Sequence, residues 1–188
     1  MKVPEQTADI FKVLSRGQFI SSNSSNKNIC DLYNIIDSEG NYENLREYFR
    51  QIGFILEHGD EYFHFSRAET KADLENKIER AYKWIDIMDF LKTFNNSFGS
   101  GFRFDIPDII NKIKLDAELE TKLESINKDK KARADVLSDI LDGLSKDGFI
   151  ELENERTGQY KVLSAFKYIE QLILTINISE AAQDEIPE

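Results

Sequence analysis

The chain has 188 residues and a formal net charge of −11, with 24 Lys and Arg against 35 Asp and Glu. Apolar residues make up 40% and aromatic residues 11% of it, which is enough to build a core and excludes global disorder. The single cysteine, Cys30, excludes a disulfide framework and a cysteine zinc cluster. Because phosphate binding needs a basic surface, the acidity argues against a protein whose main task is to coat DNA.

No segment has the pattern of a targeting signal or of a membrane anchor. The N-terminal residues lack the apolar core of a signal peptide. The longest apolar-rich stretch, Tyr168–Ile178, contains Glu170, Gln171 and Asn177, so it is too short and too polar to span a bilayer. We therefore expect a cytoplasmic protein.

Helical spacing of apolar residues alternates with short β-prone runs through the first 68 residues. Asn41 is expected to cap a helix that ends at Gly53. In chain order, the predicted elements are a helix with Ile10, Val13 and Leu14, a short strand at Phe19-Ile20, a polar loop over Ser21–Asn28, a helix with Ile29, Leu32, Tyr33 and Ile36, a helix with Leu45, Tyr48, Phe49 and Ile52, and a hairpin of Phe54–Glu57 and Tyr62–Ser66 that turns at His58-Gly59-Asp60.

The rest of the sequence repeats this order with additions. Thr70 and Asp73 form a start similar to a capping box, Pro107 suits the first position of a helix, and Asp116 is a cap for a further turn. The predicted elements are a helix from Leu74 to Phe94, a strand at Phe102–Asp105, helices after Pro107 and Asp116, a charged loop at Asn127–Arg133, a helix with Val136, Leu137, Ile140, Leu141 and Leu144 that ends at Gly148, a hairpin of Phe149–Glu153 and Gln159–Leu163, and a last helix from Ser164 to Ile178.

Two stretches resemble each other and lie half a chain apart. Leu45–Ser66 and Leu141–Ser164 both run from a helix end through Gly-Phe-Ile into a strand, a turn and a Tyr-bearing strand. This repeat predicts two copies of one unit. We expect a mostly helical α+β fold of two tandem winged-helix units, residues 1–68 and 69–178, with a disordered acidic tail at 179–188. A single irregular α+β domain is the alternative.

The sequence shows no constellation typical of catalysis. It lacks the P-loop motif, and no nucleotide or other cofactor is expected. His58, Asp60, Glu61 and His64 are the one local group of metal-ligand types, but Glu61 and His64 point apart in a strand and the turn places the other two in solvent. We therefore predict a non-enzyme with no catalytic, cofactor or metal residues, and with Cys30 as an unreactive thiol.

The helix before each hairpin decides whether a tandem winged helix can read DNA, because that helix enters the groove. Tyr42–Gln51 carries two arginines and two glutamates, and Ala132–Asp147 carries four aspartates against one arginine and one lysine. Neither suits a phosphate backbone. One basic run remains as a candidate for contact with a DNA backbone, although a solvated loop is the more common identity of such a run. It consists of Lys128, Lys130, Lys131 and Arg133.

The last predicted helix is apolar over most of its circumference. Such a helix must be covered on more than one side. The chain's own core covers part of it, and we expect a partner chain to cover the rest, as in helix-in-groove recognition. The residues predicted to contact the partner are Tyr168, Leu172, Leu174, Ile176 and Ile178.

Apolar residues and glycines form a further pattern over roughly residues 8–178. It comprises Leu14–Ile20, Leu32-Tyr33, the series Leu45, Tyr48, Phe49, Ile52, Gly53, Phe54 and Leu56, and the strand Tyr62–Ser66. In this pattern the chain resembles the kite proteins of bacterial SMC-type complexes, and most closely their MukE/MksE branch.

The resemblance implies a structural subunit without catalytic activity. Kite proteins form homodimers and bind the kleisin, which bridges the heads of the SMC-type ATPase, and they act in chromosome organisation and segregation or in plasmid defence. The resemblance implies that a kleisin and an SMC-type ATPase are the partners of this chain. It also implies that the chain contacts DNA only weakly or through the complex, and that it associates with the nucleoid through the complex. The alternative function is a tandem winged-helix transcription regulator that uses Arg46 and Arg50.

Overall fold

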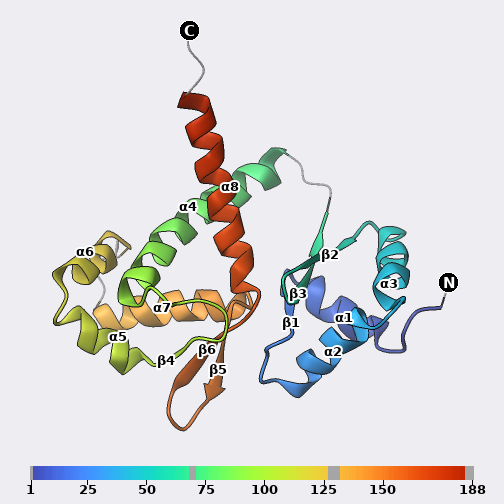
Figure 1. Ribbon diagram of the computed structural model, residues 1–188, viewed down its shortest axis with the longest axis horizontal. Coiled ribbons are helices and arrows are strands. Elements are labelled where there is room, and N and C mark those ends of the chain that lie inside the picture. Colours follow the sequence, from blue (N-terminus) through green and yellow to red (C-terminus); the bar gives the residue numbers. More distant parts are fainter. Residues whose placement is uncertain (1, 68–70, 127–131, 185–188) are drawn as a thin grey trace.

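The computed structural model describes residues 2–67, 71–126 and 132–184, without the side chains of 72–74, 77 and 176–184. Within these ranges the chain forms eight helices and six strands (Figure 1). The first half, residues 2–67, contains α1 (Thr7–Leu14), β1 (Ile20–Ser21), α2 (Lys27–Asp37), α3 (Asn41–Arg50), β2 (Ile55–Gly59) and β3 (Tyr62–Ser66). The second half, residues 71–184, contains α4 (Lys71–Phe94), β4 (Arg103–Phe104), α5 (Ile106–Ile113), α6 (Ala117–Ile126), α7 (Arg133–Lys146), β5 (Ile150–Asn154), β6 (Gln159–Val162) and α8 (Phe166–Asp184).

Each half folds its strands into a three-stranded antiparallel sheet of the same order. β3 lies between β1 and β2, and β6 lies between β4 and β5. Leu56 pairs with Phe65 in the first hairpin, and Ile150 pairs with Val162 in the second. The predicted mostly helical α+β class is confirmed. The assignment of each half as a winged helix stays a prediction, which the shared sheet order favours.

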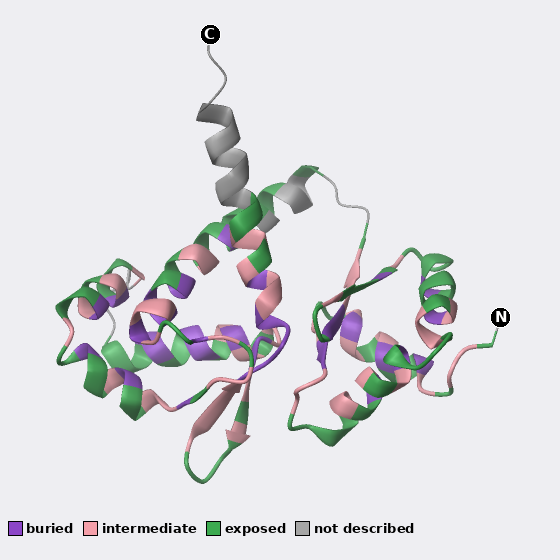
Figure 2. Ribbon diagram, in the orientation of Figure 1, coloured by how far each residue is buried: buried purple, intermediate pink, exposed green. Residues whose placement is uncertain are grey.

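Two apolar cores correspond to the two halves (Figure 2). The first is built from α1, α2, α3 and the first sheet, and the larger second core is built from α4 to α8 and the second sheet. Tyr62 crosses this division. It belongs to β3 of the first half, yet its side chain is 2% exposed and packs in the second core. Phe19, also from the first half, packs against the same core.

Aspartate caps begin two helices of the second half. Asp105 accepts a hydrogen bond from a backbone N–H three residues on at 2.8 Å, and Asp116 accepts two at 3.1 Å. Such caps satisfy N–H groups that have no partner within the helix. The predicted cap at Asp116 is confirmed, while Pro107 occupies the second position of α5 instead of the first.

The predicted cap at Asn41 is wrong. Gly40, with φ of 75°, precedes α3, and the side-chain Nδ2 of Asn41 donates instead to the carbonyl oxygen of Ile35 at 2.8 Å. Asn41 therefore ties α3 back to α2. The predicted strand at Phe19-Ile20 also shifts by one residue, because β1 begins at Ile20 and the Phe19 side chain packs against the second core.

Two helix ends differ from the predicted ones. α7 begins at Arg133, which the sequence assigned to the charged loop, and α8 continues to Asp184, past the predicted end at Ile178. Glutamate, alanine and glutamine have high helix propensities, which explains why the first part of the predicted tail is helical. The rest of that tail, residues 185–188, and the predicted cap at Thr70 lie outside the described residues. Within the described ranges, none of the helices combines the length and apolar character needed to cross a membrane.

Glycines end the two helices that precede the hairpins, as the sequence predicted. Gly53 follows α3 and Gly148 follows α7, both with φ of 82°. This left-handed conformation is unfavourable for residues that carry a Cβ atom. Gly143, in contrast, lies inside α7.

We predict that Gly53→Ala lowers the free energy of unfolding by about 1–2 kcal/mol, because an L-residue is strained at this φ. A Cβ atom at this position meets nothing within 4 Å, so the loss reports the backbone alone. Gly143→Ala, where a Cβ atom also meets nothing, is the control and should raise stability by about 0.5–1 kcal/mol. Urea unfolding measures both, and effects of the same sign would contradict the account.

Candidate partner-binding site

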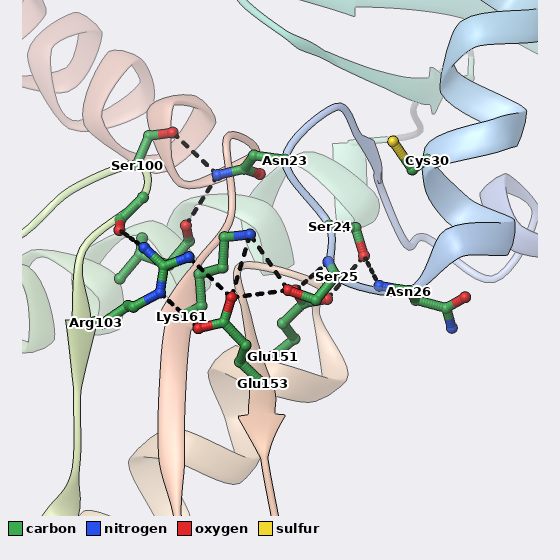
Figure 3. A network of polar contacts seen from close by, with 12 residues as sticks. Asn23, Ser24, Ser25, Asn26, Cys30, Ser100, Arg103, Glu151, Glu153 and Lys161 are labelled. Carbon is green, nitrogen blue, oxygen red and sulfur yellow. Dashed lines mark hydrogen bonds and ion pairs between the residues drawn. The ribbon is translucent and has the colours of Figure 1, made fainter.

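The polar loop after β1 joins the two halves (Figure 3). Ser24 Oγ donates to one carboxylate oxygen of Glu151 at 2.7 Å, and the Ser25 N–H donates to the other at 2.5 Å. Ser25 Oγ donates to Glu153 at 3.0 Å. Alternate residues of a strand share a face, so Glu151 and Glu153 both point from β5 toward the loop. We call these four residues, together with Arg103 and Lys161, the clasp.

Glu153 is the charged centre of the clasp. Arg103 donates from Nε at 2.6 Å and from Nη2 at 2.9 Å, one bond to each carboxylate oxygen, and Lys161 Nζ lies 3.6 Å away. Bidentate pairs of this kind are strong and directional. The hydrogen bonds from Arg103 are the main cause that lowers the pKa of Glu153 to about 2. The clasp therefore holds Glu153 as a carboxylate under all ordinary conditions.

Asn23 and Ser21 bind the turn from which α8 begins. Asn23 Oδ1 accepts from the N–H of Ser164 at 2.8 Å and also lies 3.0 Å from its Oγ, and Ser21 Oγ accepts from the N–H of Ala165 at 3.3 Å. Ser21 is 1% and Ser164 0% exposed. Buried polar groups need such partners, and here the partners come from the other half. The start of α8 is thus fixed by the first half.

A cleft of about 530 Å³ lies at the junction, with walls from both halves. We call it the junction cleft. Phe19 lies at its aromatic centre, with its ring centroid 5.1 Å from that of Phe149 and 5.3 Å from that of Tyr168. Arg67, which directly follows β3, and Arg80 from α4 also line it. Boundaries between packed units are common places for binding pockets.

The charge in the junction cleft differs from that of the whole chain. The Arg67 guanidinium lies 4.3 Å from the Phe54 ring centroid. Burial raises the pKa of Asp147, and the positive charge of Arg80 opposes this rise. Two guanidinium groups with one half-buried carboxyl, beside aromatic rings, suit a segment with both acidic and apolar side chains.

The predicted partner-contact residues of α8 fall into separate groups. Tyr168 and Leu172 line the junction cleft. Leu174 is 61% exposed and does not line it. Ile176 and Ile178 lie in α8, but their side chains fall outside the described part of the chain. The C-terminal part of α8 runs beyond the other elements (Figure 1).

The predicted basic run is described only at its last residue. Lys128, Lys130 and Lys131 lie outside the described residues. The Arg133 guanidinium is ion-paired with the carboxylate of Glu120 on α6, so part of its charge is already neutralised. The one residue of the basic run that the structure describes is therefore already paired with a carboxylate, and the contact with a DNA backbone stays a prediction.

The exposed faces of α3 and α7 mix both signs of charge. α3 exposes Arg46 and Arg50 beside two glutamates, and α7 exposes three aspartates. Arg46 and Arg50 are therefore exposed to solvent, as the regulator alternative requires, but their helix carries an equal number of acidic groups.

In the described ranges, no group of three or more His, Cys, Asp or Glu side chains is placed to hold a metal ion. Cys30 is half-buried, with Sγ 3.4 Å from the carbonyl oxygen of Ser22.

Sequence reasoning missed the residues that build the junction. Ser24 and Ser25 were predicted only as part of a polar loop, and Asn23 bonds with Ser164, which lies 141 positions away. Hydrogen bonds of this range leave no periodic signal in a single sequence. Phe19, in contrast, gave a signal, because phenylalanine is among the residues most often buried.

We predict that the clasp weakens in acid. The folded pKa of Glu153, about 2, lies below its ordinary value of 4.5, so the unfolded chain binds the proton first. Stability from this pair is complete above the ordinary pKa and is lost as the pH falls from about 4.5 toward about 2. Glu153→Gln should remove that part of the pH dependence. Urea unfolding at about pH 5 and about pH 3 tests this, and identical pH dependence in the variant would refute it.

Comparison with models of known protein families gives a match. The family model described as condensin complex protein MksE matches residues 5–173, nearly the whole stretch over which the sequence resembles this branch. Among curated proteins and among solved structures, nothing matches. A match over so much of the chain confirms the family suggested by the pattern of apolar residues and glycines. The chain belongs to the MksE family of condensin complex proteins.

Proposed function

We propose that the chain is a non-catalytic structural subunit of its condensin-like complex, and that it binds the kleisin through the junction cleft and the adjoining side of α8. The observation that carries the proposal is the position of Tyr168 and Leu172. These residues, chosen from the helical pattern as partner contacts, line a cleft whose walls come from both halves. Membership in the MksE family supports a role within such a complex.

The proposal includes the arrangement implied by the kite resemblance. Each half is a winged-helix unit, with the division between residues 68 and 69, and two copies of the chain form a homodimer. The SMC-type ATPase supplies the catalytic activity of the complex, and the chain reaches the nucleoid through that complex. The complex serves chromosome organisation and segregation or plasmid defence. The identical sheet orders of the two halves support the repeated unit.

A kleisin segment fits the cleft better than a folded domain does. The cleft volume of about 530 Å³ suits a few side chains of an extended or helical segment. Its aromatic rings provide apolar contact, and Arg67 and Arg80 provide positive charge within an acidic chain. We therefore propose that the bound segment carries apolar anchors flanked by acidic residues.

We predict that Leu172→Asp weakens kleisin binding at least about tenfold, because a carboxylate replaces an apolar contact in the cleft wall. Leu115→Asp is the matched control, since Leu115 is 89% exposed and does not line the cleft. Calorimetric titration of the intact protein with the kleisin subunit of its complex gives both affinities. Equal affinities for the two variants would contradict the proposed site.

The regulator alternative is less well supported. Exposed aspartates on α7 repel a phosphate backbone, and the two exposed arginines of α3 are balanced by glutamates. In addition, the first hairpin, which would be the wing of a DNA-reading unit, contacts α8 through its turn. These features favour a protein partner.

We predict negligible binding of the isolated protein to duplex DNA at physiological salt, and no effect of Arg46→Ala with Arg50→Ala. The reason is that neither helix presents a net positive surface. Fluorescence anisotropy with labelled duplexes over a salt series measures this. Sub-micromolar affinity with a steep salt dependence, lost in the double variant, would support the regulator instead.

A further inference from the structure

The turn between β2 and β3 is docked on the first turn of α8. Lys167 Nζ of α8 lies 2.6 Å from the carboxylate of Asp60 and 3.1 Å from that of Glu61. Ser164 Oγ donates to the carbonyl oxygen of Glu61 at 2.8 Å. Charge-assisted bonds thus join the tip of the first hairpin to α8, although more than 100 residues separate them in the chain.

Tyr62 continues this contact into the second core. Its side chain is 2% exposed, and its hydroxyl lies 3.4 Å from Oε1 of Gln171, one helical turn beyond Lys167. The Tyr62 ring also lies directly over Gly59. A Cβ atom at Gly59 would stand 2.0 Å from Cζ of Tyr62, so only glycine leaves room for the ring. The pairing of Gly59 with Tyr62 across the hairpin therefore allows the tyrosine to enter the other half.

Glu61 has an unusual backbone conformation. Its φ of 67° makes it the one residue other than glycine with positive φ in the described chain. Such strain persists where the surroundings determine the backbone. Here the Glu61 carbonyl oxygen accepts both from Ser164 Oγ and from the Ser22 N–H at 3.0 Å. The strained turn is therefore held by Ser164, just before α8, and by Ser22, just after β1.

These contacts border the junction cleft without lining it. Asp60, Glu61, Tyr62 and Lys167 are absent from the described cleft wall, whereas the next residue of α8, Tyr168, is part of that wall. His64, on the same strand as Tyr62, is part of it as well. The turn therefore sets the separation of β3 and α8, two elements that both line the cleft and whose His64 and Tyr168 rings lie 5.2 Å apart there.

We propose that the β2–β3 turn is a latch, formed by Asp60, Glu61 and Tyr62 on Ser164, Lys167 and Gln171, which holds the junction cleft in its binding geometry. This inference rests on the proposed function, because it takes the kleisin segment as the ligand of the cleft. The closed latch and the bound segment stabilise each other, since coupling between two sites is reciprocal. A device that lies outside the cleft thus regulates the affinity of the cleft.

The test compares substitutions at two similar lysines, one in the latch and one outside both the latch and the cleft. Lys167 and Lys122 each bind two carboxylates and each have 25% exposed side chains, but Lys122 pairs with Asp89 and Glu118 inside the second half. Lys167→Met should widen the distribution of distances between the halves, and Lys122→Met should not. Spin labels on Glu47→Cys and Ser138→Cys, both exposed positions, report that distance in a Cys30→Ser background.

The same variants are then titrated with the kleisin subunit. We expect Lys167→Met to lower the affinity about fivefold to tenfold, within the usual range of coupling between sites, and Lys122→Met to leave it unchanged. Gly59→Ala, which displaces the Tyr62 ring, should reproduce both effects of Lys167→Met. Adding the kleisin to the labelled wild-type protein should narrow the distance distribution.

Two results would overturn the latch. One is an unchanged distance distribution in both Lys167→Met and Gly59→Ala, and the other is a wider distribution with unchanged kleisin affinity. Failure of Leu172→Asp to weaken kleisin binding is a different outcome. It would contradict the cleft as the kleisin site, while the distance measurement would still decide whether the turn holds the halves together.

Discussion

The hydrogen bond from the buried Ser164 to Asn23 is the constraint on which the junction of the two halves depends. Asn23 Oδ1 accepts from the N–H of Ser164, a residue that is 0% exposed, and lies 3.0 Å from its hydroxyl oxygen. Losing one partner would leave a polar group buried without a hydrogen bond, at a cost of about 1–3 kcal/mol. This requirement fixes where α8 begins relative to the first half. The junction cleft, the clasp and the contact of the β2–β3 turn with α8 all lie at this same junction.

The acidic residues of the chain include two distinct groups, those in ion pairs within the molecule and those exposed on α7. Several carboxylates are used inside the molecule, where Glu153 binds Arg103 and Asp60 binds Lys167. Other acidic groups stand on α7, the helix that a DNA-reading unit would present to the groove. The junction cleft, in contrast, combines Arg67 and Arg80 with the carboxyl of Asp147. The aspartates of α7 favour a protein partner over a nucleic acid, whose phosphates they would repel.

Local features of the fold were predictable from the sequence. Gly53 and Gly148 mark helix ends because the left-handed backbone there nearly requires glycine, and the apolar spacing of α3 and α7 defines the faces that pack in the cores. The broad apolar surface of α8 also predicted cover from more than one side. Phe166 is buried in the second core, while Tyr168 and Leu172 reach the cleft.

The junction was not predictable in this way. Tyr62 has the alternation of an ordinary hairpin residue, and nothing in its neighbours shows that its ring enters the core of the other half. Asn41 was predicted to cap a helix, but its side chain donates a hydrogen bond to the carbonyl oxygen of Ile35 instead. Single-sequence patterns report local periodicity, whereas these outcomes depend on which groups meet across a hundred residues or more.

Hydrogen–deuterium exchange of the intact protein, with and without the kleisin subunit, tests the central claim most directly. The account predicts that kleisin binding slows amide exchange in β3 and in the first turns of α8, which form walls of the junction cleft. Protection confined to the exposed face of α3, with unchanged exchange in β3 and α8, would contradict it.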